Sequence, residues 1–144
     1  AQAMFDAFKA LVLEKTPRLE RQRLDENSVI QTEIGQSEAR LKAARIFLLS
    51  ELEDIWDTVS SSQTVTISQR MRIRLASTHA IHEARTVANA VYDAAGASAI
   101  FAGTPFQRRF RDIHTAAQQI QGRKAHFQTV GSFLLGHPPD LSMA

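Results

Sequence analysis

One stretch of this chain, residues 28–60, constrains the fold more than any other, because its apolar side chains keep helical spacing throughout. The stripe consists of Ile30, Ile34, Leu41, Phe47, Leu48, Leu52, Ile55 and Val59. At about 1.5 Å per residue, such a helix would be roughly 50 Å long. That length exceeds the core of a small globule and is typical of an elongated helical bundle, so we expect partner helices of similar length.

Helical spacing also surrounds this stretch. A first apolar series, in which Met4, Phe5 and Phe8 are the largest members, predicts a short helix that ends before Pro17. Ser28 followed by Gln31 fits a capping box at the start of the long helix. The polar residues 60–64 predict a linker at which the chain reverses.

A third helix is expected from about residue 68 to residue 95, where Gly96 would end it in the left-handed conformation. Thr104, Pro105 and Gln107 predict the start of a fourth helix, with threonine as the N-cap and glutamine completing a capping box. This helix should extend to about residue 120, and a last apolar stretch follows Gly122. Because no alternating strand pattern is present, the predicted fold is an all-α, up-and-down four-helix bundle with long helices.

The composition restricts the class of protein. A chain of 144 residues is long enough for one domain with its own core, so we expect a single helical-bundle domain over residues 1–144. The chain lacks an initial Met and begins inside a helical pattern, which suggests a piece of a longer protein. No apolar run approaches the roughly 20 residues of a membrane helix, and a secretory signal pattern is lacking, so a cytoplasmic protein without a membrane partner is expected. Without cysteine, disulfides and thiolate chemistry are excluded.

Histidines give two places to look for a metal. Helical bundles can bind paired metals through Glu-x-x-His motifs, but the residues three before His82 and His114 are His79 and Arg111. His79, His82 and Glu83 form the cluster HAIHE, whose spacing could converge on one ion. Packing and hydrogen bonding are the favoured interpretation of this cluster, and no metal is predicted.

A second cluster places Arg108, Arg109 and Arg111 around Phe110. Basic and aromatic residues together can bind nucleic acid, but successive residues on a helix point about 100° apart and cannot form one flat strip. A phosphate-bearing cofactor or an inter-subunit salt bridge is therefore preferred, and no nucleic acid is expected. Asp112 is an alternative, internal partner for these arginines.

Three segments of the chain resemble a known family when taken together. They are AAGASAIF at 94–101, TPFQRRFRDIHTA at 104–116 and LLG at 134–136, and the patterns at 38–41 and 44–48 are also similar. The combination resembles the C-terminal helical domain of the acyl-CoA dehydrogenase fold. The closest likeness is to the oxygenase components of two-component flavin-dependent monooxygenases, such as the hydroxyphenylacetate-type hydroxylases.

This resemblance implies a flavin, FMN or FAD, delivered in reduced form by a separate flavin reductase, and a small aromatic substrate. It also implies a homodimer or homotetramer assembled largely through the helical bundle, with an N-terminal helical domain and a central β-domain completing the flavin site. An isolated bundle would then be inactive.

The resemblance assigns candidate roles to particular residues. Gly96, Ala97 and Ser98 would form a turn that approaches the flavin of a neighbouring subunit, since small side chains leave backbone amides uncovered. Arg108 would bind the cofactor. His114 would lie near the flavin ring or the substrate and assist the oxygen chemistry, because histidine can donate or accept a proton near neutral pH. A structural histidine bonded to a neighbouring group is the alternative.

Two other functions remain open at this point. Acyl-CoA dehydrogenases often carry a catalytic glutamate in a Tyr-Glu-Gly turn, where this chain has Gln121, whose amide cannot act as that base. A dehydrogenase would need its base elsewhere. Monooxygenase relatives often carry a histidine where this chain has Gln118 and Gln119, which leaves the substrate class open. A non-catalytic helical module for oligomerisation or partner binding is the other alternative.

Overall fold

The computed structural model describes residues 1–17 and 21–139, and within these residues it contains helices and no strand, which confirms the predicted all-α class. The elements in chain order are α1 (Gln2–Glu14), η1 (Leu24–Glu26), α2 (Ser28–Ser60), α3 (Ile67–Ala95), η2 (Gly96–Ile100), α4 (Phe106–Ala116), η3 (Ile120–Gly122) and α5 (Ala125–Leu134). The η elements are short 3-10 helices. No helix in the described part of the chain combines the length and apolarity that a membrane crossing requires.

The contacts divide the chain into two compact units. Unit 1 comprises Ala1–Lys42 and Glu83–Ala116, and unit 2 comprises Ala43–His82 and Ala117–Ala144. Each of the long helices α2 and α3 therefore contributes one part to unit 1 and its other part to unit 2. The two units are described separately below.

Unit 1 is built around a cluster of large apolar side chains. The cluster contains Met4, Phe5, Phe8, Val12, Leu24, Ile30, Val87, Ala88, Val91, Ala95, Ala99 and Phe106, all of them buried. Its members come from α1, η1, α2, α3, η2 and α4. The apolar spacing of α1 is the reason for this placement, since its buried positions share one helix face.

Unit 2 buries Ala44 of α2 and Met71 and Ala76 of α3, and polar contacts also join its parts of these two helices. Arg72 forms ion pairs with Glu51, at 2.9 Å, and with Asp54. Gln69 Nε2 donates to Asp54 Oδ2 at 2.9 Å and to Thr58 Oγ1 at 2.6 Å. Because partners later in α3 contact positions earlier in α2, the two helices are antiparallel here, and the chain reversal expected at residues 60–64 is confirmed.

The helix caps differ from those predicted. At α2 the side chain of Asn27, rather than a Ser28 and Gln31 box, accepts hydrogen bonds from the backbone N–H groups of residues 29 and 30. A capping box does occur at α3. There Thr66 Oγ1 accepts from the Gln69 N–H, and Gln69 Oε1 accepts from the Thr66 N–H at 2.9 Å. At the starts of α2 and α3 more than one Ser, Thr or Asn lies nearby, such as Asn27 and Ser28 or Thr64 and Thr66, and the sequence alone does not identify which one caps the helix.

The fourth helix is shorter than predicted. It begins at Phe106 and ends at Ala116, and the chain then turns into η3. The Thr104 hydroxyl donates to the backbone oxygens of Ser98 and Phe101, so it ties down the preceding loop instead of capping α4. Gly96 follows α3 with a φ of +57°, which confirms the predicted left-handed residue at this helix end.

Candidate functional site

The turn after α3 lies in unit 1 and is held from both sides. Lys15 Nζ donates to the Ala95 backbone oxygen at 2.9 Å, which satisfies a carbonyl at the C-terminal end of α3. From the other side, Thr104 Oγ1 donates to the Ser98 backbone oxygen at 3.0 Å. Gly96 and Ala97 between these anchors are exposed, and a Cβ added at Gly96 would meet no atom within 4 Å. The backbone of this turn is therefore fixed in position and open to an approaching group.

A cavity of about 610 Å³ lies beside this turn, between the loop of residues 102–105 and the first turns of α4. Arg108, Arg109 and Asp112 complete its lining. Arg108 approaches Asp112 at 3.8 Å, with both side chains largely exposed, so this ion pair is weak and leaves the guanidinium available. Arg109 donates to the backbone oxygen of Ala3 and so joins α4 to α1.

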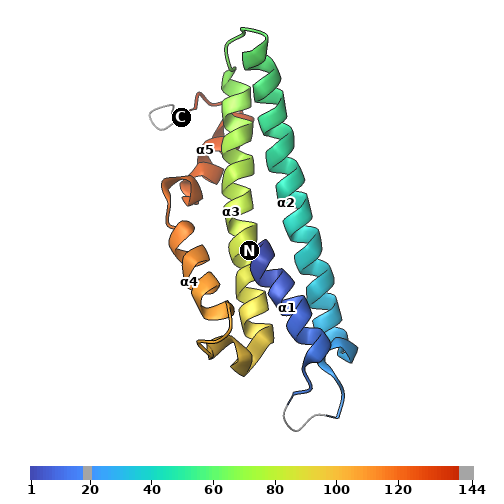
Figure 1. The fold of residues 1–144 in the computed structure, drawn as a ribbon. Coiled ribbons are helices and arrows are strands. Elements are labelled where there is room, and N and C mark those ends of the chain that lie inside the picture. The colour runs from blue at the N-terminus through green and yellow to red at the C-terminus, as the bar shows by residue number, and fades with distance from the viewer. Residues whose placement is uncertain (18–20, 140–144) are drawn as a thin grey trace. The chain divides into compact units, whose positions relative to one another are not determined.

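His114 lies further along α4 and packs against α3, beside which α4 runs (Figure 1). Its Nε2 is 2.8 Å from Asn89 Oδ1. An amide oxygen only accepts hydrogen bonds, so Nε2 is the donor in this arrangement and Nδ1 takes no part in this bond. The ring of Phe110 lies 4.3 Å from that of His114, and Tyr92 lies 4.3 Å from Phe110 on the other side. The imidazole is thereby held in one orientation.

The structure brings some of the predicted site residues together and separates others. The turn with Gly96, Ala97 and Ser98 is tied to the loop that precedes α4, and Arg108 lines the cavity beside that loop. His114 does not line this cavity and faces Asn89 instead. Sequence reasoning missed Asn89, because no motif marks it and its pairing with His114 depends on the register between α3 and α4.

The histidine cluster of α3 does not converge on one point. His79 faces the ring of Phe47 with 6.2 Å between centroids, and His82 Nε2 is 3.0 Å from the Gly122 backbone oxygen. Glu83 pairs with Arg40 at 2.9 Å. Among the residues that the structure describes, no group of three or more His, Asp or Glu side chains could hold a metal ion.

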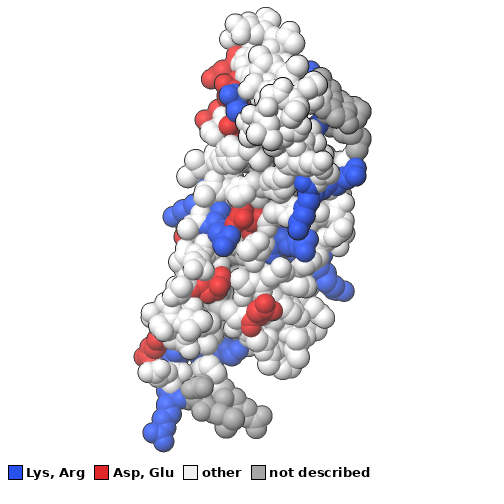
Figure 2. Space-filling view, turned by 180° about the vertical axis from the view of Figure 1, so that it is seen from behind, with Lys and Arg blue, Asp and Glu red and all other residues white. Residues whose placement is uncertain are grey.

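Charged side chains of both signs lie on the surface. On the face that Figure 2 shows, some Lys and Arg side chains lie near Asp and Glu side chains and others lie close to one another. The arginines at the cavity are a local feature. Their planar guanidinium groups match a single phosphate or carboxylate. The open turn and the exposed Arg108 therefore fit a cofactor that carries a phosphate.

Comparison with known proteins identifies relatives along nearly the whole chain. The indole-3-acetate monooxygenase of Acinetobacter baumannii is 26% identical over 139 residues, which cover 96% of this chain and 36% of the relative. The indole-3-acetate monooxygenase of Pseudomonas putida is 27% identical over 116 residues, covering 81% of this chain and 30% of the relative. The chain thus spans about a third of the length of these relatives.

A solved structure shows the same fold. XiaF from Streptomyces sp., determined in complex with FADH2 and glycerol, superposes with a TM-score of 0.90 at 19% identity, covering 97% of this chain and 36% of that one. The family model described as "Acyl-CoA dehydrogenase, C-terminal domain" matches residues 1–123. The resemblance found in the sequence is confirmed, and this chain belongs to the family of acyl-CoA dehydrogenase C-terminal domains.

Proposed function

We propose that this chain is the C-terminal domain of the oxygenase component of a two-component flavin-dependent monooxygenase, acting on an aromatic or related small molecule. The observation that carries this proposal is the match of 96% of the chain to a monooxygenase. The remaining domains of the flavin site would come from the rest of a longer protein, and a separate reductase would supply reduced FMN or FAD. The bound flavin would supply the oxygen chemistry.

Each candidate residue has a physical role in this proposal. The turn of Gly96, Ala97 and Ser98 presents a fixed, open backbone to the flavin, and Arg108 balances its phosphate charge. His114 moves a proton at Nδ1, while the Asn89 hydrogen bond holds its Nε2 hydrogen in place. Gln121 stands where the family resemblance places the dehydrogenase base, and its amide cannot act as that base, which favours a monooxygenase over a dehydrogenase that uses this position.

The proposal also includes self-association through α2. Its second half exposes a stripe of large apolar side chains at helical spacing: Ile46, Leu49, Leu52, Trp56 and Val59. Trp56 is 73% exposed. A contiguous apolar face of this kind is typical of a protein interface. Sedimentation should therefore show an oligomer that Trp56→Glu shifts towards the monomer, whereas Ser50→Glu, on the same helix outside the stripe, should leave it unchanged.

Isotope incorporation tests the reaction itself. The complete protein is incubated under ¹⁸O₂ with reduced flavin, a flavin reductase and a panel of phenols and indoles. The masses of the products are then measured by mass spectrometry. The proposal predicts a product that contains one ¹⁸O atom. Incorporation of none, together with flavin reduction by an acyl-CoA, would contradict it.

The role of His114 is tested in the same assay. His114→Ala should lower the amount of product formed per oxygen consumed by at least about tenfold. This factor is smaller than the rate enhancement that general acid–base groups typically contribute. His79→Ala, which removes a half-buried histidine from unit 2, is the matched control and should leave that ratio unchanged. Equal ratios in wild type and His114→Ala would restrict His114 to a structural role.

A further inference from the structure

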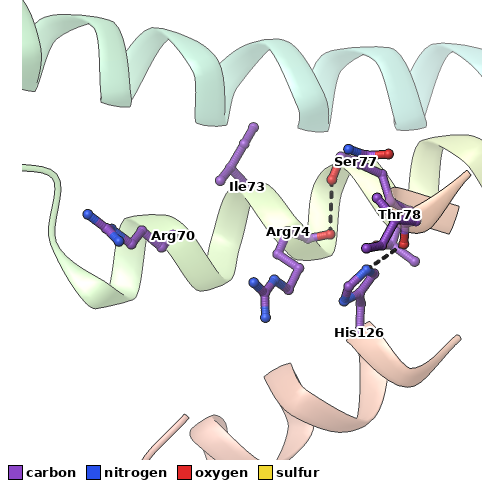
Figure 3. Close-up of a pocket in the computed structure, with 8 residues that line it drawn as sticks. Arg70, Ile73, Arg74, Ser77, Thr78 and His126 are labelled. Atoms are coloured by element: carbon purple, nitrogen blue, oxygen red, sulfur yellow. Dashed lines mark hydrogen bonds between the residues drawn. The ribbon is translucent and has the colours of Figure 1, made fainter. Parts of the chain in front are cut away.

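A second cavity, of about 340 Å³, lies entirely within unit 2. Arg70, Ile73, Arg74 and Ser77 line it from one face of α3, because residues three and four apart on a helix are neighbours. The opposite walls come from η3 and α5. Figure 3 shows Arg74 extending from α3 towards α5, and His126 extending from α5 towards α3.

The η3 wall of this cavity is held in place by hydrogen bonds. Three successive backbone oxygens each accept one bond from a side chain. The pairs are Ile120 with His126 Nε2 at 2.7 Å, Gln121 with Thr78 Oγ1 at 2.9 Å, and Gly122 with His82 Nε2 at 3.0 Å. Gly122 itself is buried, and a Cβ there would lie 2.5 Å from the Ala117 backbone oxygen. The wall is therefore a specific, close-packed structure.

The cavity offers one arginine, Arg70, for pairing with an anion. Among the described residues that line the cavity there is no carboxylate. The nearby acids Glu51 and Asp54 pair with Arg72, which points away from the face that carries Arg70. Among the described residues no carboxylate forms an ion pair with Arg70.

Two of the lining residues have large apolar side chains. They are Ile73 of α3 and Ile120 of η3, and the volume of the cavity falls within the range of about 300–1,000 Å³ that small-molecule pockets occupy. We propose that this cavity binds a small organic anion, whose carboxylate or phosphate group pairs with Arg70 and whose compact apolar body lies between the two isoleucines. This site is distinct from the cavity beside Arg108, with which it shares no lining residue.

Three probes of one shape test the proposal on the complete protein by calorimetry. They are 4-bromobenzoate, 4-bromophenyl phosphate and the neutral 4-bromobenzamide. We expect one or both anions to bind at least about tenfold more tightly than the amide, because one charge-assisted hydrogen bond contributes a difference in affinity of this size. The preferred anion distinguishes a carboxylate ligand from a phosphate ligand.

The position of the bound probe in the protein is tested separately, because the same probes can also enter a substrate site. In crystals soaked with the better anion, the anomalous signal of bromine should lie between Ile73 and Ile120. Arg70→Gln should weaken binding at this site about tenfold, and Arg45→Gln, an exposed arginine of the same unit, should not. Ser77→Leu, which fills the cavity without removing charge, should abolish the signal; circular dichroism verifies that this variant is folded.

Three results would overturn the proposal. One is no heat of binding up to about 10 mM probe, which would reveal even a weak site with a Kd of about 1 mM. Another is bromine only at other positions in the crystal. The third is unchanged affinity in Arg70→Gln for a probe that crystallography places in this cavity.

Discussion

The two units of this chain differ in how they are held together. Unit 1 buries aromatic and aliphatic side chains from six elements, and every member of the buried core cluster belongs to it. Unit 2 buries smaller or fewer apolar side chains, such as Met71 and Ala76, and joins α2 to α3 also by ion pairs and the hydrogen bonds of Gln69. Large apolar side chains of α2 remain exposed in this unit, so unit 2 presents an apolar surface that a partner could cover.

This difference agrees with the roles proposed for the two units, a cofactor site in unit 1 and self-association in unit 2. The candidate flavin-facing turn and His114 are in unit 1, where a packed core can hold a site rigidly. The candidate association surface is in unit 2. A site that positions a cofactor needs precise geometry, and an interface needs apolar area that the chain itself leaves uncovered.

The largest expected effect comes from truncating the core of unit 1. Phe8 is completely buried, so Phe8→Ala should lower the free energy of unfolding by about 3–5 kcal/mol. The comparable truncation Trp56→Ala on the exposed face of unit 2 should change it by less than about 0.5 kcal/mol. Urea unfolding of the 144-residue chain, at concentrations where sedimentation shows a monomer, measures both. Equal losses would remove the contrast between the units.

A pair of glycines gives the next largest difference. Gly122→Ala should destabilise the chain by about 1–3 kcal/mol, since the new methyl group would collide with the backbone of residue 117 in unit 2. Gly35→Ala has open space within α2 and should stabilise it by about 0.5–1 kcal/mol through higher helix propensity. Thermal unfolding should therefore shift in opposite directions, and a shift in the same direction would show that η3 is not tightly packed.

The polar network of unit 2 provides a test of similar or smaller size. Gln69→Met keeps the side-chain volume but removes the bonds to Asp54, Thr58 and Thr66, which should cost about 1–2 kcal/mol. Gln36→Met, at an exposed position of α2, is the control and should be nearly neutral. A neutral Gln69→Met would mean that unit 2 is held by packing, as unit 1 is.

The smallest effect concerns a surface ion pair of unit 1. Hydrogen bonds from Lys9 and then Gln2 lower the pKa of the Asp6 carboxyl. Because the folded-state pKa is the lower one, this stabilisation is present above the unfolded pKa of about 4 and is lost as the pH falls further. Asp6→Asn should therefore be slightly less stable than wild type at pH 7, and the difference should disappear on acidification. A difference that grows in acid would contradict the assignment, and Asp93→Asn is the control.

Much of this fold was predictable from the sequence, for physical reasons that particular elements illustrate. The bounds of α2 follow from its long periodic stripe, because a periodic signal becomes clearer with length. The caps at Asn27 and Thr66 were not predicted, since neighbouring residues of equal capping ability compete for each helix start. The break after Ala116 depends on tertiary hydrogen bonds to η3 that no local pattern contains.

The candidate site was predictable to a smaller extent. Glycine and its small neighbours marked the turn after α3, and the resemblance to a family singled out His114. The pairing of His114 with Asn89, and the separation of His114 from the cavity at Arg108, depend on how α4 is set against α3. That register is a property of the folded unit, and single residue types do not encode it.

The most direct test of the central claim is rapid mixing of oxygen with the complete protein carrying reduced flavin, while the absorption spectrum is followed. The account predicts a transient species whose spectrum matches neither reduced nor oxidised flavin. Single-step reoxidation of flavin without that species, or a complete protein that binds no flavin, would contradict it.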